Sequence, residues 1–265
     1  MNLVEMLQPS TSWHLQLPSE YSAHKFEIID STNTHLKSLA GDGAQHLTLA
    51  VSKIQTAGRA RGDRTWESEE GNVYWSVLLR PDPSSPSLST LPFVAALATH
   101  DTVSSFLTSE KNVQIKWPND ILVEGKKISG CLLESNITTH SAGDSWIVVG
   151  IGINVQSFPS GSLNYQATSL VKENSKLARR DSVIEKLSDR FLVRFQQWLS
   201  GGSSDIVADV EKRISFLGEE VEVSPGTDRS VRIRGRFAAL SPDGQMMLEI
   251  GDETRLIGAG DVFGI

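Results

Sequence analysis

The chain has 265 residues, of which 39% are hydrophobic and 22% charged, as in ordinary globular proteins and unlike disordered or fibrous ones. Its 32 acidic side chains outnumber its 25 basic ones, so the net charge of −7 argues against a surface built mainly to bind DNA. No apolar run is long enough to span a bilayer. The segment 1–16 does not have the pattern of a signal peptide. The single cysteine cannot form an internal disulfide, which favours a reducing compartment, the cytoplasm.

The first part of the chain alternates between strand-like and helix-like segments. A helix is expected after a strand over 25–30; Ser31 or Thr32 can cap it and Gly41 can end it. Helical spacing of apolar residues predicts further helices from Leu91 and over 184–198. β-Branched, aromatic or alternating residues predict the other strands. These strands cover 46–54, 73–80, 113–117, 121–124, 127–135 and 146–155.

The composition changes near residue 215. From there, short segments that alternate with period two are separated by turn signals, as in small β-barrels. These segments begin at Glu220, Val231 and Met247. The sequence therefore predicts an α+β domain over 1–214 and a small β-barrel over 215–265.

A loop rich in glycine and arginine, QTAGRARGDRTW, covers residues 55–66. Arg59, Arg61 and Arg64 can bind phosphate or carboxylate oxygens in pairs. Such a loop can fold over a polyanion such as a nucleoside triphosphate, and Trp66 can stack on the site or seal it. A solvated basic turn is the alternative interpretation. The phosphate-binding pattern GxxxxGK[ST] is absent from the sequence.

A second candidate segment, KWPND, covers residues 116–120 and precedes a hairpin with the turn Glu124-Gly125-Lys126. The hairpin can fold Lys127 back beside Asp120. In that arrangement the lysine faces an anionic reactant and the carboxylate faces an amine. A hairpin with ordinary exposed charges is the alternative.

Two glycines, Gly150 and Gly152, interrupt the buried strand over 146–155. Glycine weakens a strand unless something comes close to the backbone. A flat ring lying across the strand, with Asn154 at its amide edge, is one explanation, and a closely packed helix is the other. No helix with a third glycine opens from this segment, so it is not a dinucleotide-binding fingerprint.

A metal site built by the protein is not expected. The histidines lack metal-ligand spacing with Cys131 or with carboxylates. Cys131 itself lies in an apolar stretch and is expected to be an unreactive core thiol.

Taken together and in this order, these segments resemble the biotin protein ligase family over about residues 25–265. The matching pieces are Ser31-Thr-Asn33, the loop 55–66, the segment 116–120 with Lys127 and Gly130, and the glycine strand 150–154. The family loop usually reads Gly-Arg-Gly-Arg-x-Gly-Arg-x-Trp. Here Ala60 replaces the middle glycine, which is tolerated at negative φ, and Asp63 replaces a later one. Asp63 adds a negative charge that alters loop closure or affinity.

The resemblance implies an α+β fold: a mixed, largely antiparallel sheet with helices packed on it, as in class II synthetases, and an SH3-like C-terminal barrel. It implies that biotin and ATP give biotinyl-5′-adenylate and pyrophosphate, and that biotin then passes to a lysine of a biotin carboxyl carrier domain. Two like charges 4 Å apart repel by ~4 kcal/mol at an effective dielectric of 20, so a fixed cation is needed where carboxylate and phosphate meet. Mg²⁺ is expected to neutralise the departing pyrophosphate.

The family's site residues carry over to matching positions. Lys127, Asp120 and Arg59 are implied to be catalytic; Asp120 either orients the acceptor amine or assists its deprotonation. Trp66 and Trp117 are expected to supply apolar walls. The residues implied to bind biotin are Ser31, Thr32, Asn33, Gln55, Gly58, Arg59, Ala60, Arg61, Trp66, Lys127 and Gly130. The residues implied to bind the nucleotide are Arg59, Arg61, Arg64, Trp66, Lys116, Asn119, Lys127 and Asn154.

Three other functions compete with this one. Lipoate ligases and octanoyl transferases share the architecture but bind a straight acyl chain, and the arginine loop followed by KWPND argues against them. A DNA-binding repressor is disfavoured by the net charge of −7 and by the short segment before Phe26. A non-catalytic biotin-binding module would not need Lys127 and Asp120. We expect a carrier domain as protein partner, no membrane and no DNA, and an edge strand of the main sheet can pair two copies into a homodimer.

Overall fold

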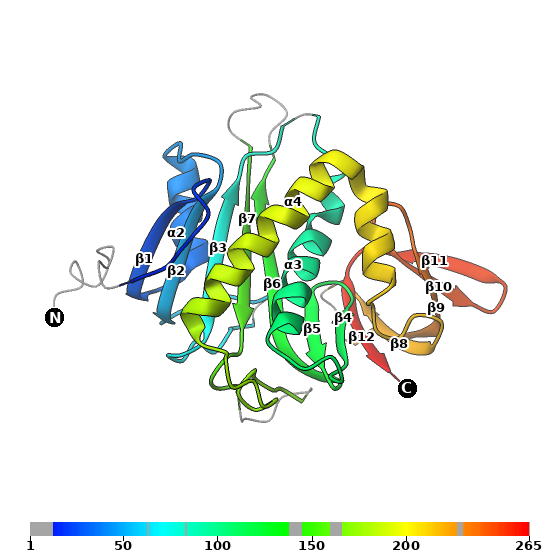
Figure 1. The fold of residues 1–265 in the computed structure, drawn as a ribbon. Helices are drawn as coiled ribbons and strands as arrows, with labels where there is room; N and C mark the ends of the chain where they lie inside the picture. Colours follow the sequence, from blue (N-terminus) through cyan, green and yellow to red (C-terminus); the bar gives the residue numbers. More distant parts are fainter. Residues whose placement is uncertain are drawn as a thin grey trace.

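A computed structural model describes residues 13–62, 64–82, 84–137, 145–159, 166–226 and 230–264. Its larger sheet has seven strands in the order β1-β2-β3-β7-β6-β5-β4 (Figure 1). β1 and β2 run parallel and the other neighbouring pairs run antiparallel, so the sheet is mixed and largely antiparallel, as predicted. The strands are β1 (Ser22–Ile29), β2 (Thr48–Gln55), β3 (Val73–Leu79), β4 (Val113–Lys116), β5 (Asp120–Val123), β6 (Lys126–Asn136) and β7 (Trp146–Ile153).

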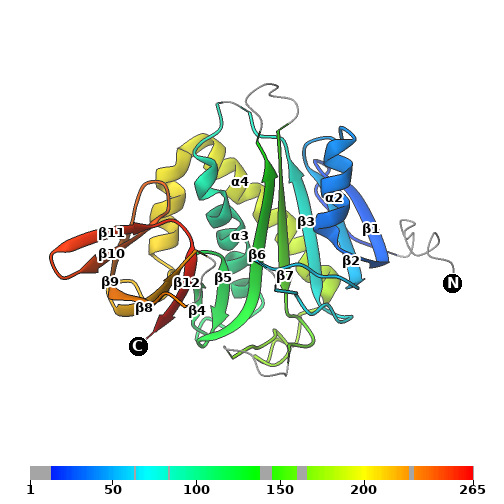
Figure 2. The same ribbon diagram turned by 180° about the vertical axis from the view of Figure 1, so that it is seen from behind.

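Helices cover both faces of this sheet. α3 (Leu91–Ser105), preceded by the short η1 (Leu88–Thr90), and α4 (Arg180–Glu211) lie on one face, and α2 (Thr32–Gly41) lies on the other (Figures 1 and 2). The larger apolar core lies under α3 and α4, and a smaller one lies under α2. α4 is longer than the predicted 184–198 helix, because the chain turns at Gly202 with φ 77° and then continues as helix.

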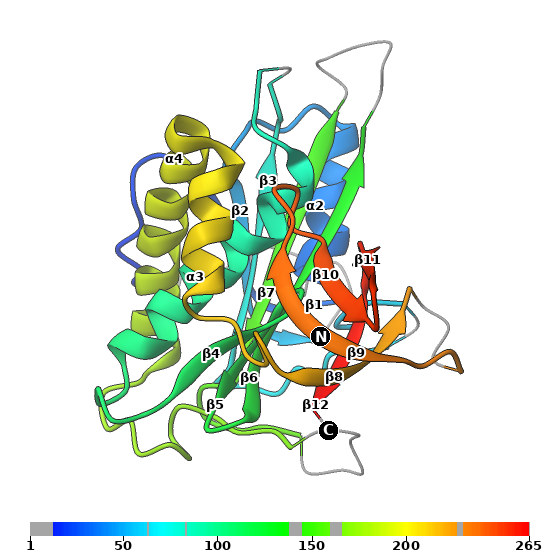
Figure 3. The same ribbon diagram turned by 90° about the vertical axis from the view of Figure 1, so that its right-hand side faces the viewer.

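The C-terminal residues form a second, all-antiparallel sheet in the order β11-β10-β9-β8-β12, at the β4 end of the large sheet (Figures 1 and 3). This matches the predicted SH3-like barrel. Its strands are β8 (Glu220–Pro225), β9 (Ile233–Leu240), β10 (Met246–Ile250), β11 (Glu253–Ile257) and β12 (Gly260–Gly264). We propose that the domain boundary lies at 214/215, between the end of α4 and the start of β8.

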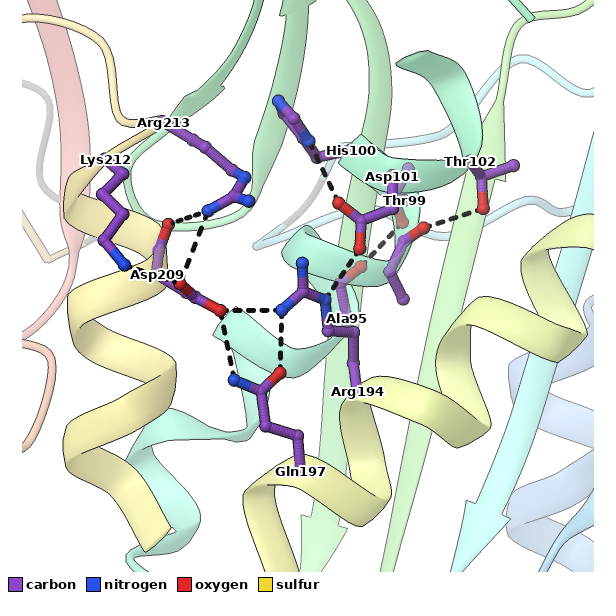
Figure 4. Close-up of polar contacts among 11 residues, drawn as sticks. Ala95, Thr99, His100, Asp101, Thr102, Arg194, Gln197, Asp209, Lys212 and Arg213 are labelled. Carbon is purple, nitrogen blue, oxygen red and sulfur yellow. Dashed lines mark hydrogen bonds and ion pairs between the residues drawn. The ribbon is translucent and has the colours of Figure 1, made fainter. Parts of the chain in front are cut away.

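A network of charged side chains joins α3 to both parts of α4 (Figure 4). Arg194 donates to Asp101 Oδ2 at 2.7 Å and to Asp209 Oδ2 at 2.8 Å. Gln197 also binds Arg194 and Asp209, so the two parts of α4 are tied together across the turn at Gly202. The chain that leaves α4 towards the second sheet is therefore fixed relative to α3.

Among the residues that the structure describes, no helix is long and apolar enough to cross a membrane.

Candidate active site

The floor of the main pocket is a row of residues across four strands. Strand register places Tyr74, Gly152, Gly130 and Asp120 side by side on β3, β7, β6 and β5. A Cβ on Gly152 would lie 2.6 Å from the indole ring of Trp66. The floor is therefore flat, and the protein's own tryptophan lies across it.

The neighbouring row contains the second floor glycine, Gly150, which pairs with Ser76 on β3. A Cβ at this glycine would lie 2.1 Å from Oδ1 of Asn33, which comes from the first turn of α2. The packing of a helix residue on this strand, one of the two explanations offered by the sequence, is confirmed at Gly150. At Gly152 the close group is the protein's own Trp66, and the Asn154 amide donates elsewhere, to Thr168 O.

The first turn of α2 and the end of β2 form a polar wall at one end of the floor. Ser31 caps α2 by accepting from the backbone N–H of Thr34. Oε1 of Gln55 accepts from the backbone N–H of Thr32 at 2.9 Å and from its hydroxyl at 3.0 Å. The Thr32 hydroxyl also lies 2.7 Å from that of Ser76. These contacts hold the wall in place through several mutual hydrogen bonds.

The arginine loop is a small hairpin over the pocket. Arg59 and Thr65 pair as an antiparallel bridge, and Gly62 has φ 64° near the tip. The backbone N–H of Trp66 donates to Gly58 O at 3.0 Å, and a Cβ on Gly58 would clash with Trp66 O at 2.3 Å. Gly58 is thus required by the closure of the loop on itself.

Of the two positions at which the loop departs from the usual family pattern, one is described. Ala60 is not among the residues with positive φ, so the alanine is accommodated as expected. Asp63 lies outside the described residues.

Lys127 and Asp120 meet at the edge of the floor, where their Nζ and Oδ1 atoms are 2.7 Å apart. The hairpin turn has positive φ at Glu124 and Gly125, which is typical of a type I′ turn. A β-bulge follows, so that Leu122 pairs with Lys127 although Ile121 pairs with Ser129. Bulges redirect side chains, and this one accounts for Lys127 facing Asp120. The juxtaposition predicted from the hairpin is confirmed.

Two of the loop arginines, Arg61 and Arg64, contact oxygen atoms of neighbouring segments. Arg61 donates to Oδ1 of Asn119 at 3.3 Å and to Gly260 O at 3.1 Å, and Arg64 lies 3.6 Å from Asp261. β12 of the C-terminal sheet thus contributes directly to the pocket.

The third loop arginine, Arg59, pairs at 3.0 Å with Glu134 of β6. Burial on its own raises the pKa of Glu134, but hydrogen bonds from Lys37 and Asn33 and the charge of Arg59 outweigh burial and lower it. Glu134 is therefore a carboxylate anion at neutral pH.

Most of the predicted site residues line one pocket of about 810 Å³, its open mouth included. The predicted residues that line the pocket are Ser31, Thr32, Asn33, Gln55, Arg59, Ala60, Arg61, Arg64, Trp66, Asn119, Asp120, Lys127 and Gly130.

Three predicted site residues are not part of the pocket lining. Gly58 lies at the base of the loop. Asn154 is buried, and its side-chain amide donates to Thr168 O at 3.0 Å. Nζ of Lys116 lies 5.3 Å from the ring centre of Phe263, and burial lowers its pKa.

The expectation that Trp117 forms an apolar wall of the site is wrong. Its ring is buried in the core on the α3 side, and its Nε1–H donates to Gly244 O in the C-terminal sheet at 3.1 Å. Trp117 therefore holds the two sheets together. Cys131 behaves as expected, since burial raises the pKa of its thiol to about 12 and keeps it protonated.

Sequence reasoning missed Ser76, Glu134 and Asp261. Ser76 and Glu134 could have been found, because each lies an even number of residues from a floor residue on its own strand and so shares its face. Ser76 lies two residues from Tyr74, and Glu134 lies four residues from Gly130. Asp261 carried no such signal, because only tertiary packing brings β12 to the loop.

Comparison with known proteins adds an independent line of evidence. Residues 25–154 match the biotin/lipoate A/B protein ligase family. The bifunctional ligase/repressor BirA of Bacillus spizizenii is 32% identical, over 89% of this chain and 72% of its own length. The biotin–[acetyl-CoA-carboxylase] ligase of Paracoccus denitrificans is 30% identical, over 88% of this chain and 97% of its own.

A solved structure has the same fold. The biotin protein ligase from Aquifex aeolicus in complex with biotin and ATP has 28% sequence identity and a TM-score of 0.75, over 91% of this chain and 97% of that one. Fold, pocket and sequence agree: the chain belongs to the biotin protein ligases, a family of enzymes.

Proposed function

We propose that the protein activates biotin with ATP to biotinyl-5′-adenylate, releasing pyrophosphate, and then transfers biotin to a lysine of a biotin carboxyl carrier domain. The observation that carries this proposal is the position of the Lys127–Asp120 pair. It lies at the edge of a glycine floor, in one pocket with the polar wall of α2 and a loop that carries three arginines.

Biotin would lie in the pocket beside Trp66, which covers the floor, with its polar ring system at the wall. Thr32, Asn33 and Gln55 offer hydroxyl and amide groups there. Trp66 supplies an apolar surface above the glycines, and its Nε1–H is buried without a partner in the described residues. Its unused donor and flat ring suit a ligand with both apolar and polar parts.

The first step brings a carboxylate to the α-phosphate. Lys127 is only 15% exposed at its side chain, and a preorganised cation in such a site stabilises the charge that develops in the transition state. Arg59, Arg61 and Arg64 would bind the nucleotide phosphates, which replace the carboxylate and carbonyl oxygens that now hold these side chains.

Mg²⁺ would enter with the nucleotide. The described residues contain no cluster of three metal-ligating side chains. Mg²⁺ usually takes one or two carboxylates in addition to substrate phosphates, and Asp120 and Asp261 are the carboxylates that line this pocket. When bound, the ion supplies charge neutralisation for the pyrophosphate. The residues fit this role as partners of a nucleotide-borne ion.

The second step needs a neutral acceptor amine. At a reference pKa of ~10.4, about 0.04% of a lysine is neutral at pH 7. Asp120 lies beside the site of the carboxylate chemistry and is 23% exposed, so an amine can reach it from solvent. We propose that Asp120 accepts a hydrogen bond from this amine, which orients it, and takes its proton as the amine attacks the acyl carbon of the adenylate and AMP leaves.

The test is an acid panel followed by transfer. Pyrophosphate release is measured with ATP and biotin, lipoate or octanoate, and the mass of an added carrier domain is then followed. We expect release with biotin alone among the three acids, and one biotin added per carrier domain. Release with lipoate or octanoate instead would assign the protein to the sister branch of the family. Biotin binding without release would leave a binding module.

Two further expectations on partners stay proposals. We propose that the ligase does not bind DNA, which filter binding tests. We also propose that two copies pair through β1, an outer strand of the large sheet, which analytical ultracentrifugation tests.

A further inference from the structure

One carboxylate beside the pocket, Glu134 of β6, binds three side chains from two segments, α2 and the arginine loop. Its Oε2 accepts from Asn33 Nδ2 at 3.0 Å. Its Oε1 accepts from Lys37 Nζ at 2.7 Å and from Arg59 Nη2 at 3.0 Å. The side chain is 15% exposed and shares a face of β6 with Gly130, which belongs to the pocket floor. Glu134 thus links the wall of the pocket to its loop.

The contact with Asn33 decides which way the carboxamide of Asn33 points. Oδ1 of Asn33 accepts from the Ser76 hydroxyl at 2.6 Å, and its Nδ2 donates to Glu134. If the carboxamide were flipped, its NH₂ would face the Ser76 hydroxyl and its oxygen would face the Glu134 carboxylate. The amide oxygen and the carboxylate are both acceptors and would repel each other. Asn33 also lies so close to Gly150 that a Cβ there would be 2.1 Å from Oδ1. Position and orientation are therefore both fixed.

The contact of Glu134 with Arg59 differs from the contact with Asn33, because Arg59 is also proposed to bind the nucleotide phosphates. Its side chain is 47% exposed and belongs to the loop over the pocket. A partly buried carboxylate that loses its only cation is costly. Glu134 has a second cation in Lys37, on α2. Arg59 can therefore leave while Glu134 stays paired.

We propose that Glu134 is a positioning residue of the biotin and nucleotide site. It fixes the Asn33 carboxamide for biotin and holds Arg59 at the mouth of the pocket until the nucleotide phosphates take it over, with Lys37 as the remaining counter-charge. This inference rests on the proposed function.

The first measurement concerns biotin alone. Glu134→Gln keeps the size of the side chain but offers a weaker acceptor to Asn33. Loss of one hydrogen bond to a charged acceptor is expected to raise the Kd for biotin about tenfold, measured by calorimetry without ATP. An unchanged Kd would overturn the role assigned to the contact with Asn33.

The second measurement is a double-mutant cycle on ATP. Lys37→Met leaves Arg59 as the one cation that Glu134 still contacts. We expect the KM for ATP to rise about fivefold, the scale of a partly exposed ion pair, with kcat within twofold of the wild type. The rise should disappear when Lys37→Met is combined with Glu134→Gln, since Arg59 is then no longer held.

The matched control is Lys53→Met. Lys53 pairs with Glu27 at 2.6 Å, is not part of the pocket lining, and loses the same charge. Its KM for ATP should equal that of the wild type. Equal KM values for Lys37→Met and the control, or a rise that persists in the double variant, would overturn the inference for Arg59.

A loss of kcat and of thermal stability in Lys37→Met and Glu134→Gln, with neither Kd nor KM changed, would show a merely structural role and also overturn it. Failure of the proposed function looks different. In that case the wild type itself neither binds biotin nor releases pyrophosphate with it, and both the proposed function and this inference are overturned. An active wild type whose variants do not respond overturns the inference alone.

Discussion

Two regions of the molecule each contain a nearly buried cation paired with carboxylates, one in the structural core and one in the pocket. Arg194 lies between Asp101 and Asp209 in the α3–α4 network, and Lys127 lies against Asp120 in the pocket (Figure 4 shows the first). Both cations are almost buried, at 13% and 15% exposure. Arg194 is enclosed by its own helices, whereas Lys127 borders a cavity. Burial and pairing alone thus do not mark a reactive group; a space for another anion beside the pair does.

The largest effect is expected at Lys127, on the rate and not on stability. Lys127→Met removes the cation placed where carboxylate and phosphate meet, so biotin-dependent pyrophosphate release should fall about a thousandfold, the scale of a lost transition-state contact. Lys126→Met is the control, because the neighbouring residue carries the same charge but does not line the pocket. Similar rates of pyrophosphate release in the two variants would contradict the special role given to Lys127.

Arg194 should show the opposite pattern, with a large effect on stability and none on the rate of the folded enzyme. Arg194→Met removes the cation that Asp101 and Asp209 share, while His100 stays beside Asp101 and Lys212 and Arg213 stay beside Asp209. We therefore expect a loss of about 2 kcal/mol, between that of an exposed ion pair and that of a fully broken buried pair. Urea unfolding measures the loss. A loss below about 1 kcal/mol, as at exposed ion pairs, would contradict the structural role.

The glycine floor predicts an intermediate effect. Gly152→Ala places a Cβ 2.6 Å from the Trp66 ring, so the indole must shift. Overpacking costs about 1–3 kcal/mol, and we expect the KM for biotin to rise about tenfold. Gly41→Ala, where a Cβ meets nothing within 4 Å, is the control. Equal KM values in both variants would show that the position of the indole does not affect biotin binding.

The smallest effect is a pH dependence of stability in the α3–α4 network. Burial opposes ionisation of Asp209, but hydrogen bonds from Gln197, Lys212 and Arg194 lower its pKa from 3.8 to about 2. A lowered pKa in the folded state stabilises the protein above pH 3.8, and this contribution is lost as the pH falls towards 2. The difference in unfolding free energy between the wild type and Asp209→Asn should therefore be constant above about pH 5 and shrink below it. A difference that does not vary with pH would contradict this account.

The local parts of the site could be predicted from the sequence. The Ser31 cap of α2 and the two-residue turn of the β5–β6 hairpin depend on neighbouring residues, and the hairpin brought Lys127 to Asp120. The two floor glycines also signalled a close approach, because glycine in a strand interior needs a reason.

The parts that depend on tertiary packing could not be predicted. Asp261 reaches the loop only because β12 of the second sheet returns to it, and Trp117 turns away from the pocket to hold that sheet. The predicted helix over 184–198 was too short because it covered only the apolar residues at helical spacing. The chain turns at Gly202 and continues as helix to Glu211, and Asp209 in this second part contacts Arg194 in the first.

The most direct test of the central claim isolates the first step. Exchange of labelled pyrophosphate into ATP is measured without any carrier domain, in the presence of biotin and then of lipoate. If the pocket activates biotin as an adenylate, biotin supports exchange, lipoate does not, and Lys127→Met lowers the exchange rate about a thousandfold. No exchange with biotin, or exchange of equal rate in Lys127→Met, would contradict the account.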